Sequence, residues 1–98
     1  MEKRGTLKHG LKIGDQVHKD FEFREGTAAD YFAAEAEADS SKQISFRAAL
    51  AAQQLQRIGT FNGPFTLSML GKLHPSDLKM LMDAREALEA EGEGEQHG

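Results

Sequence analysis

The chain has 98 residues, a formal net charge of −4 and no cysteine. This length fits one domain with a small core, since such a chain buries only about 60 to 65% of the surface that its unfolded form exposes. The lack of cysteine excludes disulfide bonds, thiolate zinc sites and cysteine nucleophiles. No apolar run approaches the roughly 20 residues that span a bilayer, and the N-terminus lacks the apolar segment of a secretory signal, so we expect a soluble cytoplasmic protein.

The excess acidic charge lies at the C-terminal end of the chain. Residues 1–88 carry 12 acidic and 12 basic side chains, and the excess comes from Glu89, Glu91, Glu93 and Glu95. Within the neutral part, residues 1–12 carry four bases and one acid, whereas residues 25–39 carry five acids and no base. We interpret this separation as solvated faces or as pairing of the two regions in the fold; the alternative is electrostatic steering of a partner.

Residues 6–23 predict an antiparallel hairpin. Apolar residues alternate along both arms, and Gly14 begins the loop. A two-residue loop would pair Ile13 with Gln16 and put the apolar sets of the two arms on opposite faces. A three-residue loop pairs Ile13 with Val17 and unites the apolar sets, so we expect the second register.

Residues 27–38 predict a first helix. The Thr27 hydroxyl can cap it, and Asp30 occupies the capping-box position. The expected inner face is mostly alanine and consists of Ala29, Ala33 and Ala36, with Phe32 at its edge.

Residues 45–58 predict a second helix. Apolar residues recur at spacings of three and four, at Ala48, Ala51, Leu55 and Ile58. Arg47, Gln54 and Arg57 are expected to point away from the core, and Gly59 is the expected end of the helix.

A chain reversal is expected after the second helix. Asn62-Gly63 suits a turn, and Pro64 prevents both helix and strand from continuing. Two more helices are expected at residues 67–72 and 75–90. Thr66 can cap the first of them, Pro75 lies in the first turn of the second, and Asp77 lies where the helix dipole favours an anion.

The last eight residues, 91–98, alternate glutamate with glycine and have nothing to bury, so we expect a disordered acidic tail. The predicted fold class is α+β: a single domain over residues 1–90, with an N-terminal antiparallel β-hairpin followed by three to four helices. A hairpin alone is marginally stable and must cover a helical core or pair with a second copy through an exposed edge. We therefore expect a homo-oligomer.

No group of residues indicates catalysis or cofactor binding. The glycines of GTFNGPFTLSMLGK do not form a P-loop pattern, and no serine lies in a nucleophile elbow. His74 and Asp77 are spaced as a candidate metal pair, but His74 directly precedes Pro75 and is better explained as part of the helix start. We expect no enzymatic activity, no cofactor and no metal.

Two blocks of the chain carry a resemblance to a known family. The first is DFEFREGTAADYFAAE and the second is RIGTFNGPFTLSMLGKLHPSDLKML. The residues that carry it are Phe23, Arg24, Glu25, Thr27 and Asp30, then Arg57, Gly59, Gly63, Pro64, Leu70, Leu73, Pro75, Asp77 and Leu78. Over residues 6–85 they resemble the small tail assembly chaperones of Mu-like and P2-like contractile-tailed bacteriophages and prophages. Two departures are Gly26, where proline is expected, and Ala29, where glycine is familiar.

The resemblance implies a non-catalytic assembly factor of the infected host cytoplasm. Proteins of this kind hold the tail tape-measure protein soluble while tube subunits polymerise around it. Many of their genes also yield a longer product by frameshifting, which is a second expected partner. The thioether side chains of the last third suit an adaptable partner groove, although core packing is their commoner role. The predicted partner contacts are Phe61, Phe65, Met69, Met80 and Met82.

The alternative function is a small phage DNA-binding transcriptional regulator, with residues 45–58 and 75–90 as a helix-turn-helix pair. The connection between these helices is far longer than the usual turn of about three or four residues. Residues 75–90 also carry two bases against four acids. We therefore expect neither nucleic acid nor membrane among the partners.

Overall fold

The computed structural model describes the backbone of residues 2–97 and the side chains of residues 2–92. A three-stranded antiparallel sheet has the order β1-β2-β3. The hairpin consists of β1 (Glu2–Ile13) and β2 (Gln16–Arg24), and β3 (Leu55–Ile58) pairs with the other side of β2. The α+β class with an N-terminal hairpin followed by helices is confirmed.

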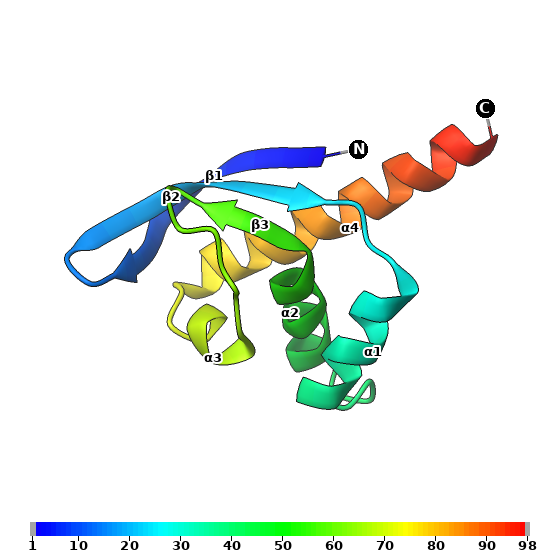
Figure 1. Ribbon diagram of the computed structural model, residues 1–98, viewed down its shortest axis with the longest axis horizontal. Coiled ribbons are helices and arrows are strands. Elements are labelled where there is room, and N and C mark those ends of the chain that lie inside the picture. Colours follow the sequence, from blue (N-terminus) through cyan, green and yellow to red (C-terminus); the bar gives the residue numbers. More distant parts are fainter. Residues whose placement is uncertain (1, 98) are drawn as a thin grey trace.

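Over residues 2–97, four helices complete the fold: α1 (Ala28–Glu37), α2 (Gln43–Gln54), α3 (Leu67–Leu70) and α4 (Pro75–His97). The long helix α4 runs along the sheet, and α2 lies between α1 and α3 (Figure 1). Fully buried side chains from the sheet and α4 meet in the main core, among them Phe23, Ile58, Leu81 and Leu88. None of the helices in the described part of the chain has the length and apolar character that a bilayer crossing requires.

The hairpin register differs from the expected one. Ile13 pairs with Gln16, so the loop has two residues and the predicted three-residue loop is wrong. The left-handed conformation lies at Gly14 (φ 61°), whereas the longer loop would favour such a conformation at Gln16. A bulge over residues 7–10 then shifts the register and returns the buried apolar residues of β1 to the core side. The displaced residue is Val17, which is 53% exposed.

The predicted second helix is partly wrong, because its last four residues form β3. In this strand Ile58 pairs with Phe21, and Leu55 pairs with Phe23. A register shift between these pairs lets both apolar residues of β3 face the core, although they are three residues apart. Gln54, which was expected to point outward, is 0% exposed at the end of α2.

The first helix buries the face opposite to the one predicted. Asp30, Ala34 and Ala38 are buried, whereas Ala29 and Phe32 are exposed. An ion pair between Asp30 and a β2 residue, described below, turns this side of the helix inward. The residues four and eight positions later then follow onto the same face.

The later helices begin where the sequence indicates. Thr66 accepts a hydrogen bond from the Met69 N–H at 3.2 Å, although α3 ends before residues 71–72. The last helix is longer than predicted and includes Glu91 and Gly92, which were assigned to the tail; Lys3 donates to Glu91 at 2.9 Å. The backbone of residues 93–97 also belongs to α4, no side chain is described there, and the disorder predicted for residues 93–98 stays a prediction.

Candidate partner-binding surface

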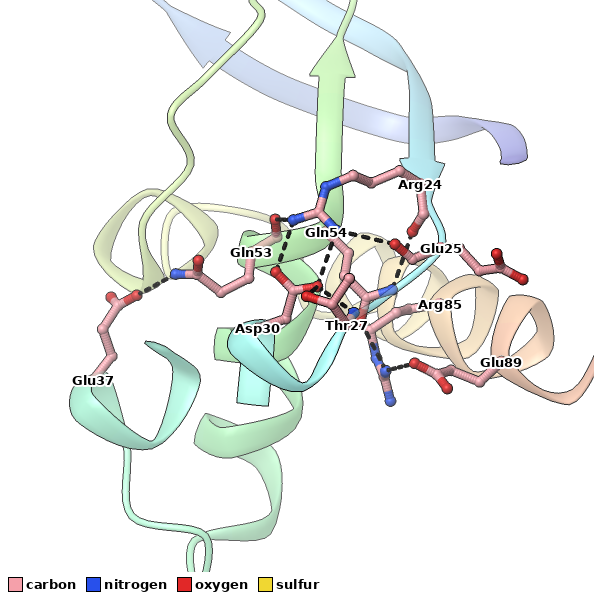
Figure 2. A network of polar contacts seen from close by, with 9 residues as sticks. All are labelled: Arg24, Glu25, Thr27, Asp30, Glu37, Gln53, Gln54, Arg85 and Glu89. Atoms are coloured by element: carbon pink, nitrogen blue, oxygen red, sulfur yellow. Dashed lines mark hydrogen bonds and ion pairs between the residues drawn. The ribbon is translucent and has the colours of Figure 1, made fainter. Parts of the chain in front are cut away.

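A partly buried ion pair joins the end of β2 to the start of α1. The Arg24 guanidinium donates to both oxygens of Asp30, at 2.7 and 2.9 Å, and to the backbone carbonyl of Gln53 at 2.9 Å (Figure 2). Hydrogen bonding to Arg24 holds the pKa of Asp30 below its ordinary value. Asp30 also accepts the Thr27 N–H at 2.8 Å, which is the carboxylate half of the predicted capping box.

The same network continues into α2 and α4 through Gln54. Its amide nitrogen donates to the Arg24 carbonyl oxygen at 3.1 Å, and its amide oxygen accepts from Arg85 at 3.1 Å (Figure 2). Arg85 is buried and also donates to Glu89 at 3.2 Å. A Cβ atom at Gly26 would lie 2.8 Å from the Gln54 side chain, so glycine at this position leaves room for the amide.

Replacement of Gln54 tests this network. We expect Gln54→Ala to lower the free energy of unfolding by about 2–3 kcal/mol, because it removes the buried acceptor of Arg85, which keeps only Glu89, and the donor to the Arg24 carbonyl oxygen. Gln53→Ala is the matched control and should change stability by less than about 1 kcal/mol, because that side chain makes only an exposed contact with Glu37. Urea unfolding measures both, and equal losses would contradict a structural role for the Gln54 amide.

A second carboxylate joins α4 to the bulge of β1. Asp77 is 0% exposed and accepts the N–H groups of Lys8, His9 and Gly10 at 2.8, 2.9 and 2.9 Å. Burial acts to raise the pKa of Asp77, but these backbone donors outweigh it, and the pKa lies below its ordinary value. The carboxylate therefore satisfies the N–H groups that the bulge removes from the β ladder.

The candidate metal pair does not converge on a common point. Both oxygens of Asp77 are occupied by backbone donors, and the His74 ring stacks on His9 with centroids 4.1 Å apart. His74 Nδ1 accepts the Ser76 N–H at 3.1 Å, as suits a residue at the start of a helix. Among the residues that the structure describes, no group of three or more His, Asp or Glu side chains is arranged to hold a metal ion.

The separated charges of the sequence do not pair with each other. Lys3 contacts Glu91, and Arg4 contacts Glu22 at 3.1 Å on the sheet. No ion pair among the described side chains joins residues 1–12 to residues 25–39. The basic side chains of residues 1–12 therefore do not neutralise the exposed acidic side chains around α1.

The five predicted partner residues lie in different environments. Phe65 and Met82 are buried, and Phe61 and Met69 are half-buried against the core. Met80 is the member with an exposed side chain, at 37%. Their role in partner binding stays a prediction.

The largest exposed apolar side chains lie on the helices. Phe32 of α1 is 73% exposed and Ile44 of α2 is 64% exposed. Ile44 stands at a groove of about 240 Å³ between α2, α3 and α4, whose lining includes Leu67 and Leu70. The sequence pattern did not identify Phe32 or Ile44 as exposed apolar residues, because periodicity alone gives no signal for which face of a helix packs inward.

The fold and its surface define a small α+β protein in which the buried carboxylates of Asp30 and Asp77 join the hairpin to the helices, and in which the helices expose the apolar side chains of Phe32 and Ile44. The chain belongs to the tail assembly protein gp41 family, a family of Mu-like phages, whose model matches residues 7–97. The resemblance to a phage tail assembly family is thereby confirmed, and the protein has a role in tail assembly. No curated protein and no solved structure matches the chain.

Proposed function

We propose that this protein is a chaperone of phage tail assembly that binds the tail tape-measure protein and keeps it soluble until the tail tube forms. The observation that carries the proposal is the family match over residues 7–97. The match spans nearly the whole chain and is not limited to one short motif. The proposal therefore concerns the domain as a whole.

The surface of the molecule supports a binding role. A chaperone that holds its client needs exposed apolar side chains on a stable scaffold. Phe32 and Ile44 supply such side chains on helices, and the contacts of Asp30 and Asp77 stabilise the scaffold beneath them. The protein acts by binding, without catalysis, in the cytoplasm of the infected host.

Self-association and a longer frameshifted product complete the proposed set of partners. Within the part of the chain that the structure describes, the strand order leaves the outer edge of β1 without a neighbouring strand. Asp77 occupies the N–H groups of residues 8–10, whereas residues 2–6 offer an edge for pairing with a second copy.

The alternative of a DNA-binding regulator has less support. The two helices proposed as a helix-turn-helix pair, α2 and α4, are separated by β3 and α3. The described part of α4 also carries more acidic than basic side chains. An acidic helix is repelled by phosphates rather than drawn into a groove of DNA.

Co-expression with the tape-measure protein of the same phage or prophage tests the proposed function. Affinity purification and size-exclusion chromatography should yield a soluble complex of fixed stoichiometry. An unrelated acidic protein of similar size, expressed in its place, is the control and should leave the tape measure insoluble. Recovery of an insoluble tape measure with no co-purified partner would contradict the proposal.

A further inference from the structure

The exposed face of α1 is an apolar surface that the fold does not use. Phe32 lies at its centre and is 73% exposed, whereas the Tyr31 ring lies toward α2, with its centroid 6.4 Å from that of Phe46. Three further exposed residues share the outward side of the helix by their spacing: Ala28, Ala29 and Ala36. Helix α1 lies at the edge of the molecule, with α2 on its inner side (Figure 1).

The small side chains make this face suitable for a second helix. The buried face, with Ala34 and Ala38, already packs against α2. Alanines on the outward face let another helix approach within about 8–10 Å between axes, the distance of ordinary helix packing. Phe32 then supplies a large apolar side chain for a groove on that second helix.

The charge around the face selects the sign of its partner. Glu35 is exposed on the same side of the helix as Phe32, and residues 25–39 contain no basic side chain. The nearest preceding base, Arg24, is held by Asp30. A partner with basic side chains beside its apolar stripe therefore complements the face, whereas an acidic one is repelled.

We propose that the outward face of α1 docks a basic amphipathic helix of a partner protein. This inference deepens the proposed function, since the helix belongs to the client that the chaperone holds. A second copy of the chain fits less well, because its base-rich segment is the strand β1. The described basic residues of its helices pair with acids of α4, as Arg47 does with Glu86 and Lys79 with Asp83.

A synthetic amphipathic peptide of leucine and lysine is the direct probe, with the same peptide carrying glutamate in place of lysine as its control. Isothermal titration calorimetry with the full chain should detect binding of the lysine peptide and no binding of the glutamate peptide. Phe32→Ala should weaken the affinity for the lysine peptide at least about tenfold, because the complex loses the burial of the ring. Glu35→Gln should weaken this affinity less and should make it less dependent on salt concentration.

Val17→Ala is the control, since Val17 of β2 is also an apolar side chain that is more than half exposed, at 53%. It should bind the lysine peptide as the unaltered protein does. The inference is overturned if Phe32→Ala binds as tightly as the unaltered protein, if the glutamate peptide binds equally well, or if Val17→Ala is the variant that loses binding.

The same variants in the tape-measure assay separate this inference from the proposed function. If both the unaltered protein and Phe32→Ala keep the tape measure soluble, the function stands and the α1 face is not the docking surface. If the unaltered protein fails to keep it soluble but binds the lysine peptide through Phe32, the surface stands and the proposed client is wrong. Loss of solubility in Phe32→Ala alone supports both.

Discussion

Asp77→Ala is expected to lower the free energy of unfolding by about 3–4 kcal/mol. The substitution removes the acceptor of three charge-assisted hydrogen bonds, each worth about 1.5 to 3 kcal/mol and not additive. The N–H groups of residues 8–10 lie in a bulge and have no strand partner to replace the carboxylate. Urea unfolding, monitored by circular dichroism, measures the loss.

Two substitutions bracket this result. Asp77→Asn keeps one acceptor oxygen and loses the charge, so it should fall between the unaltered protein and Asp77→Ala. Asp83→Ala changes an exposed carboxylate of the same helix and should cost less than about 1 kcal/mol. A loss of similar size in Asp77→Ala and Asp83→Ala would show that the bulge does not depend on the carboxylate.

The free energy of unfolding at acidic pH gives a second measure of the same contact. The pKa of Asp77 is lower in the folded chain than its ordinary value of 3.8. Its contribution is therefore fully present above that value and is lost as the pH falls through the lower pKa of the folded state. Asp77→Asn should lose less stability than the unaltered protein over this acidic range, which urea titrations at several pH values would detect.

Local signals in the sequence placed Asp30 and Asp77 correctly at the starts of helices. Their chief partners, however, are Arg24 and the backbone of residues 8–10, which lie on the hairpin. Capping and dipole rules describe a helix and its own first turn, so they contain no information about a distant strand. The bulge escaped prediction for the same reason, because its N–H groups are satisfied by a residue from the other end of the chain.

The strand β3 shows how tertiary pairing overrides a local pattern. Leu55 and Ile58 continue the apolar spacing of α2 and fit a helix well. In the structure they face the core from a bulged strand, because the free edge of β2 offers hydrogen bonds and Phe21 and Phe23 offer apolar partners. The sequence pattern favoured the helix because it reports the local apolar spacing and contains no information about pairing with β2.

The wrong prediction with the greatest consequence for the site is the one for the buried face of α1. Its alanines occur on both sides of the helix, so periodicity could not decide which side packs inward. The Arg24–Asp30 ion pair decides it and leaves Phe32 outside. The tail assembly family was recognisable from the two sequence blocks, whereas the proposed docking face depends on this long-range contact.

Phe23→Ala is expected to lower the free energy of unfolding by about 3–5 kcal/mol, the usual cost of truncating a fully buried phenylalanine. Phe23 is 0% exposed, packs edge to face against Phe21 with ring centroids 5.7 Å apart, and pairs with Leu55 of β3. Its removal leaves a cavity where the sheet meets the helices. Urea unfolding measures the loss. If the free energy of unfolding has the same slope against urea concentration in Phe23→Ala and in the unaltered protein, the substitution has changed stability alone.

Phe32→Ala makes the identical chemical change on the surface and separates the scaffold from the docking face. The phenyl ring is mostly in solvent, so its loss removes little burial, and alanine is the better helix former by a few tenths of a kcal/mol. We therefore expect a stability change within about 0.5 kcal/mol of zero. A loss comparable to that of Phe23→Ala would mean that the ring is buried against this chain in solution, which would leave α1 without an apolar face to offer a partner.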